Sequence, residues 1–130
     1  MKNLLLTVSL FIVVLINAQK NRIDDFQFTA KESIESLLDS SEYFQDNNQT
    51  RDALHYAELA YLKAQSELYT EGEAKAAYQL GYLYRKQHAK KKALKYLLSA
   101  SDLFKKLDHK QKLSLTYYQL GKVFQKSGSF

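Results

Sequence analysis

Residues 77–81 read Ala-Tyr-Gln-Leu-Gly, and residues 117–121, forty positions further along, read Tyr-Tyr-Gln-Leu-Gly. The same step relates two other segments: residues 51–56 read Arg-Asp-Ala-Leu-His-Tyr and residues 91–96 read Lys-Lys-Ala-Leu-Lys-Tyr. Self-similarity at a fixed period of this size is typical of proteins built from stacked structural repeats. The sequence therefore predicts a repeat architecture, and the extended surfaces of such arrays bind other proteins.

Apolar and small residues recur at helical spacing within each copy. Ala77, Leu80, Gly81 and Tyr84 stand at positions i, i+3, i+4 and i+7, so they share one face of a helix. Corresponding stripes are predicted for all of the remaining helices of the array. They are Ala93, Leu94, Leu97, Ala100 and Phe104; Tyr117, Leu120, Gly121 and Phe124; and, less regularly, Leu37, Ser40, Ser41 and Phe44 followed by Ala53, Ala57, Ala60 and Ala64.

Local signals mark where the helices begin and end. Residues 29–32, 70–73 and 108–111 each have the form of a capping box, in which a side chain accepts a hydrogen bond from a free amide of the first turn. Asn47-Asn48, His88 and Gly128 fall at equivalent turn positions, where the chain needs a residue in the left-handed conformation. These signals predict helices near residues 30–46, 51–68, 72–87, 90–106 and 110–126.

These residues resemble the tetratricopeptide repeat, whose first helix carries Leu-Gly and an aromatic residue and whose second helix carries small residues around a bulky one. The resemblance covers about residues 30–130 and implies an all-α fold of antiparallel helix-turn-helix repeats, stacked as a short right-handed solenoid of about 2.5 repeats. Ala77 departs from the pattern, which has a large residue there. The period also exceeds the usual 34 residues, and the helix-ending proline is absent. The residues that carry the resemblance and define the fold are Leu80, Gly81, Tyr84, Ala93, Leu97, Ala100, Leu120, Gly121 and Phe124.

The N-terminus has the form of a secretory signal. Lys2 precedes an apolar run at residues 4–16, and Ala18 satisfies the small-residue rule for cleavage. The run is shorter than the roughly 20 residues that a spanning helix needs, so we expect no stable membrane span in the mature chain. An uncleaved anchor is the less favoured alternative. The predicted organisation is a signal peptide at 1–18, a lead-in segment at 19–29 and a repeat domain at 30–130, with repeats near 30–69, 70–108 and an incomplete 109–130.

Export predicts a location in the periplasm or cell envelope. The chain has no cysteine, which excludes a disulfide framework, so an exported domain of this kind relies on helix packing. Because arrays generally contain three or more units, the incomplete third repeat predicts the front of a longer protein or a shortened gene product.

Charge is distributed unevenly. Residues 19–73 carry 5 Lys and Arg against 12 Asp and Glu, a net charge of −7, whereas residues 74–130 carry 13 against 2, a net charge of +11. The basic half, with three lysines at 90–92, favours an acidic protein or peptide or an anionic lipid surface, although a solvated helix start is the plainer interpretation. Acidic and basic halves can also attract each other between two copies. Nucleic acid is not an expected partner of an exported chain.

No pattern in the sequence indicates catalysis. His55, His88 and His109 are widely separated, and none has the spacing of a metal site. Glycine-rich phosphate loops and nucleophile elbows are absent, and the acidic pair at 24–25 reads as solvated. We therefore expect no catalytic, metal-binding or cofactor-binding residues.

The resemblance implies that first helices line a concave groove. Tyrosines with neighbouring amides suit an extended or helical peptide, although Tyr78 and Tyr118 could equally pack between units. The expected function is a non-catalytic scaffold or adaptor. The alternative is the N-terminal sensory region of a longer or truncated membrane signalling protein, such as a sensor histidine kinase or a transcriptional regulator. The candidate binding residues are Tyr78, Gln79, Tyr82, Tyr118, Gln119 and Lys122.

Overall fold

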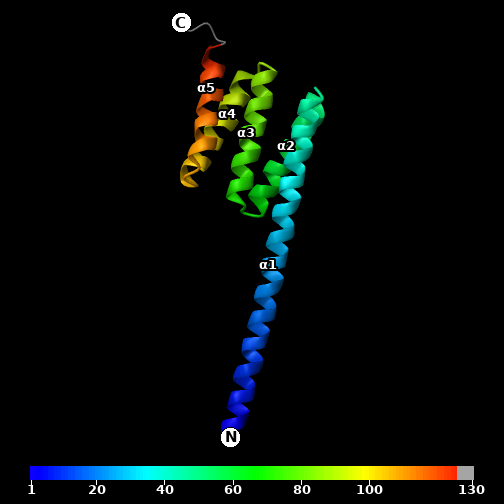
Figure 1. Cartoon of the computed structure of the whole chain (residues 1–130), viewed down its shortest axis with the longest axis vertical. Helices are drawn as coiled ribbons and strands as arrows, with labels where there is room; N and C mark the ends of the chain where they lie inside the picture. Colours follow the sequence, from blue (N-terminus) through cyan, green and yellow to red (C-terminus); the bar gives the residue numbers. More distant parts are fainter. Residues whose placement is uncertain (126–130) are drawn as a thin grey trace.

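The computed structural model of the chain describes residues 1–125, which form helices joined by three-residue turns (Figure 1). The predicted all-α class is confirmed: no strand occurs among the described residues. Each helix after the first begins and ends within two residues of its predicted bounds. The helices are α1 (Lys2–Asp46), α2 (Thr50–Ser66), α3 (Thr70–Lys86), α4 (Lys90–Lys106) and α5 (Lys110–Gln125).

The first helix begins far earlier than predicted. α1 is unbroken over 45 residues, and its N-terminal part projects away from the other helices (Figure 1). Thr29 therefore caps nothing, and its Oγ1 donates to the carbonyl of Phe26 (2.9 Å) inside the helix. Near the N-terminus an 18-residue window has a mean hydropathy of 1.6 and no buried residue. By length and composition α1 is thus able to cross a membrane, a property that it shares with signal sequences.

The helices stack in two layers. α3 lies at the centre and contacts every other helix, whereas α2 and α4 do not approach each other closely along their backbones. Because short turns join consecutive helices, neighbours in the chain run antiparallel. α1, α3 and α5 consequently form one layer, and α2 and α4 form the other. The result is a helical, repeat-like stack.

Within residues 1–125, the four turns share one geometry at intervals of twenty residues. The turn predicted at Gly128 lies outside the described residues. Asn48, Leu68, His88 and Asp108 have positive φ angles of 59°, 54°, 61° and 50°. In each turn the amide of the next residue donates to a carbonyl five residues back, as in the 2.8 Å bond from Gln49 to the carbonyl of Phe44. This pattern is the Schellman motif, which satisfies free carbonyls at a helix end.

The prediction of capping boxes, in contrast, is wrong. α3 begins one residue earlier than its box requires, with Tyr69 as N-cap and no side-chain hydrogen bond. Asp108 is the left-handed residue of its turn and therefore does not cap α5. Instead, Nδ1 of His109 accepts a hydrogen bond from the amide of Lys112 (3.4 Å). The left-handed turn, and not the box, sets the start of these helices.

Leu68 occupies its left-handed position at a cost. Its side chain is 88% exposed, so little packing offsets the strain of a positive φ in a residue with a branched side chain. We expect Leu68→Gly to raise the free energy of unfolding by about 1 kcal/mol, measured by denaturant unfolding of the full chain in detergent micelles. Asn48→Gly is the matched control and should change less, because asparagine tolerates this conformation. Equal or lower stability for Leu68→Gly would contradict the strain.

The core depends on close approach at Gly81. A Cβ atom built on Gly81 would lie 2.5 Å from Cγ of Leu97, so α4 rests directly against the backbone of α3. Ala93 and Ala100, on either side of Leu97, are fully buried. One repeat earlier, Ser41 replaces the glycine and Ala57 replaces the leucine. There the Ser41 hydroxyl donates to the carbonyl of Ala53 (2.8 Å). The small residues Ser41 and Ala57 thus let α1 and α2 approach each other in the first unit.

A second part of the core joins the last three helices. Phe104 is fully buried against Ala74, Ala77 and Ala100, and Leu113 of α5 packs against the same cluster. The departure of Ala77 from the repeat pattern is thereby explained, because the phenylalanine ring occupies this part of the core.

Candidate functional site

The candidate binding residues lie on the layer of first helices. Tyr78 and Tyr82 stand one turn apart on α3, and Tyr118 and Lys122 stand one turn apart on α5. Tyr118 is exposed, while Tyr78 and Tyr82 are half-buried against the core. We call this surface, made by α1, α3 and α5, the first-helix face.

Gln79 and Gln119 tie adjacent first helices together. Gln79 Nε2 donates to Oε1 of Gln45 (2.9 Å) and to the hydroxyl of Ser41 (3.3 Å) on α1. Gln119 Oε1 accepts from Nε of Arg85 (2.8 Å) on α3. Both side chains are buried, so the structure uses these two predicted binding residues to hold the face together.

Tyr78 also joins α3 to α5. Burial raises the pKa of its phenol, and a hydrogen bond with Gln119 partly offsets the rise. Its ring packs against two parts of the core. Packing between units, the alternative considered for Tyr78, is therefore what the structure shows, whereas Tyr118 stays open.

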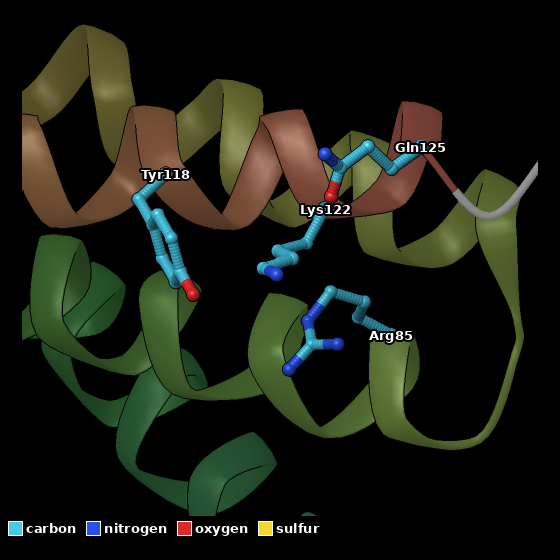
Figure 2. A pocket seen from close by; sticks show the side chains of 4 residues that line it. All are labelled: Arg85, Tyr118, Lys122 and Gln125. Carbon is cyan, nitrogen blue, oxygen red and sulfur yellow. The ribbon is translucent and has the colours of Figure 1, made fainter. Parts of the chain in front are cut away.

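A basic cavity of about 370 Å³ opens between α3 and α5 (Figure 2). Tyr118 and Lys122 extend from α5 toward α3, Gln125 lies along α5, and Arg85 comes from α3. Each cation is held beside an aromatic ring: Cζ of Arg85 lies 5.3 Å from the ring centroid of Tyr82, and Nζ of Lys122 lies 5.3 Å from that of Tyr118. No carboxylate lines this cavity among the described residues. Two fixed positive groups in one concave space suit an anion.

The opposite end of the face is acidic. A cavity of about 210 Å³ there is lined by Glu35, Asp39 and Glu42 of α1, with Lys75 and Lys112 across from them. The face therefore changes sign along its length, from the carboxylates of α1 to the cations between α3 and α5.

The acidic end is braced by a charge network around Glu35. Lys75 Nζ lies 2.9 Å from Oε1 of Glu35 and 3.0 Å from that of Glu71, and the Tyr69 hydroxyl donates to Glu35 Oε1 (3.0 Å). Burial and the bond to Glu35 raise the pKa of Tyr69 to about 12. Burial by itself lowers the pKa of Lys75, but its bonds to both carboxylates raise it overall, so the ammonium stays charged. The network holds these side chains in place between α1 and α3.

The structure places the three histidines apart. His88 is in a turn, His109 packs its ring edge-on against Phe104 (5.7 Å), and His55 lies on α2 beside Tyr56. Within residues 1–125, no group of three or more His, Asp or Glu side chains is placed to hold a metal ion. Neither the histidines nor the carboxylates form a reactive cluster in this part of the chain.

Arg85 is the functional candidate that the sequence pattern did not single out. Its side chain is a cation, whereas the residues forty positions away on either side are Gln45 and Gln125. Gln45 accepts a hydrogen bond from Gln79, whereas Arg85 donates one to Gln119 through Nε. Arg85 also lines the cavity. Comparing positions 45, 85 and 125 would have shown one cation among three residues of equivalent placement.

Comparison of the chain with protein families, with curated proteins and with solved structures finds no match. What the first-helix face can do therefore follows from its own chemistry. It offers one tyrosine and two cations around an open cavity, and it has an acidic end on α1.

Proposed function

We propose that this chain is a non-catalytic scaffold of the tetratricopeptide type that binds a segment of a partner protein along the first-helix face. The observation that carries the proposal is the pair of cations, Arg85 and Lys122, mounted on tyrosine rings in a cavity without a carboxylate. An acidic side chain or terminal carboxylate of the partner suits this cavity, and basic side chains suit the acidic end near Glu35.

The sign change along the face also gives the partner a direction. Like charges placed together cost free energy, so a bound segment has its acidic part between α3 and α5 and its basic part over α1. Rigid aromatic groups such as Tyr118 and Tyr82 add contact area at a low cost in side-chain entropy.

A second candidate rests on α1. The apolar window lies in α1, which is also the first helix of the first repeat unit, and α1 has no break between these two parts. We propose, as the alternative, that the chain is the N-terminal sensory region of a membrane signalling protein, such as a sensor kinase or regulator. Both candidates place the stack in the cell envelope, and both use the first-helix face to bind a partner.

Photo-crosslinking tests the face directly. A benzoylphenylalanine in place of Tyr82 should capture a partner from the envelope, whereas the same group in place of Leu62, which is 62% exposed on α2, should not. We expect Tyr82→Ala combined with Lys122→Ala to weaken the captured complex by about tenfold or more, as loss of contact residues at the centre of an interface does. The far-ultraviolet circular dichroism of this variant should stay helical.

Tyr43→Ala with Lys91→Ala is the matched control, since both side chains are exposed outside the cavity. It should leave capture unchanged. Capture that survives the Tyr82 and Lys122 changes, or that is insensitive to high salt, would contradict an ionic contact at this cavity.

A further inference from the structure

α5 repeats the surface that α3 offers to its second helix. On α3 the backbone of Gly81 receives the side chain of Leu97. On α5 a Cβ atom built on Gly121 meets no other atom within 4 Å among the described residues. Among residues 1–125 the same glycine notch is therefore present twice, and a side chain from this part of the chain fills it once.

Residues beside the second notch are more exposed than their equivalents on α3. Tyr117 is 48% exposed and Phe124 is 51% exposed, whereas their equivalents on α3, Ala77 and Tyr84, are buried. A cavity of about 380 Å³ lies over Gly121, bordered mainly by apolar surface. We call this surface the α5 outer face; its residues are Tyr117, Tyr118, Gly121, Lys122, Phe124 and Gln125.

The internal contact between α3 and α4 shows what fits such a notch. α4 supplies a leucine at its centre, Leu97, with the alanines Ala93 and Ala100 one turn away on each side, and all three are fully buried. Small residues let the two backbones approach, and the leucine fills the space that the glycine leaves. A helix with this stripe would continue the α3–α4 contact one unit further along the stack.

The charge of α5 and its surroundings indicates which kind of helix can bind there. Residues 110–125 contain three lysines and no acidic residue, and Nζ of Lys90 lies 5.7 Å from the ring centroid of Phe124. A second copy of α5 would bring lysines against lysines. The alanine stripes of α2 and α4 are already buried in their own units. A helix with acidic residues beside its stripe is the complementary occupant.

We infer that the α5 outer face binds an amphipathic helix of a partner protein, with small residues one turn on each side of a leucine and with Asp or Glu along its edges. This surface adjoins the cavity at Arg85, and the two share Tyr118, Lys122 and Gln125. The leucine of the partner helix occupies the notch at Gly121, and its carboxylates face Lys122 and Lys90.

A synthetic peptide tests this inference. The probe is a fluorescent peptide of residues 90–106 in which Lys90, Lys91, Lys95, Lys105 and Lys106 are replaced by Glu, and its anisotropy is measured against the full chain in detergent micelles. We expect saturable binding, and about tenfold weaker binding when the peptide also carries Leu97→Ala. In the protein, Gly121→Leu fills the notch and should weaken binding at least as much. It should leave the melting temperature no lower, because the new side chain meets open space.

Tyr82→Ala separates the two surfaces: it should leave binding of this peptide unchanged while it weakens capture at the first-helix face. Absence of saturable binding, or equal binding to the Gly121→Leu variant, overturns the inference. It is also overturned if the full chain sediments as a dimer that Gly121→Leu dissociates, because a second copy would then cover the α5 outer face.

Discussion

Gly81→Leu is expected to lower the free energy of unfolding by about 1–3 kcal/mol, the usual cost of overpacking a core. The reason is the 2.5 Å separation between a Cβ atom at this position and Cγ of Leu97, with the amide nitrogen of Leu97 only slightly further away at 3.1 Å. The leucine side chain can rotate, but the backbone of α4 has to move. Thermal or denaturant unfolding of the full chain in detergent micelles measures the change.

Gly121→Leu is the matched control for this prediction. The glycine stands in the same sequence context on α5, and a side chain there meets nothing within 4 Å. Leucine is the better helix former by about 0.8 kcal/mol, so this variant should be as stable as the unmodified chain or more stable. Equal destabilisation of both variants would show that the close approach at Gly81 is not what holds α4 against α3.

A double variant gives an independent check. Shortening Leu97 to alanine removes the atoms that a new side chain at position 81 would meet. Leu97→Ala should therefore cost less in the Gly81→Leu background than by itself, a coupling that a double-mutant cycle detects for residues in contact. Additive changes would mean that the two positions do not share this space.

Phe104→Ala is expected to cost about 3–5 kcal/mol, the largest effect of any single change considered. The ring is fully buried and fills space among alanines of α3 and α4, which cannot expand to close a cavity. Leu113 of α5 packs on the same cluster, so the loss should loosen the attachment of α5 as well. The melting temperature of the full chain measures the effect.

Phe26→Ala is its control, since this ring is 62% exposed on α1. Surface substitutions of this kind usually change stability by less than about 0.5 kcal/mol. A small effect of Phe104→Ala, comparable with that of Phe26→Ala, would contradict the placement of Phe104 at the junction of the last three helices.

The repeat period predicted the four short helices well, and the physical reason lies in the turns. One Schellman geometry at positions 48, 68, 88 and 108 recurs every twenty residues, so recognising Asn48 and His88 was enough to place the helix ends. Leu68 and Asp108 were not predicted as left-handed residues, because leucine and aspartate indicate that conformation less clearly than asparagine or glycine do. Their conformations follow from equal spacing and not from side-chain chemistry.

The start of α1 could not be read from a local signal. Thr29 and Glu32 match a capping box, but no glycine or proline stands before Gly72, so nothing interrupts the helix upstream. At the candidate site, periodicity predicted that Tyr118 and Lys122 share one helix, and both lie on α5. The hydrogen bonds that occupy Gln79 and Gln119 depend on partners 34 to 38 residues away in sequence, at Ser41, Gln45 and Arg85. Spacing along one helix carries no information on such partners.

The unbroken first helix has a mechanical consequence. Residues 1–29 are exposed, and the first fully buried side chain of α1 is Ile34. At 1.5 Å per residue, the stretch from Lys2 to Ile34 is a lever arm of about 48 Å. A tilt of about 5° where α1 leaves the stack moves its far end by about 4 Å. A small change in the angle at which α1 packs against α2 and α3 therefore moves its apolar N-terminal end by several ångströms.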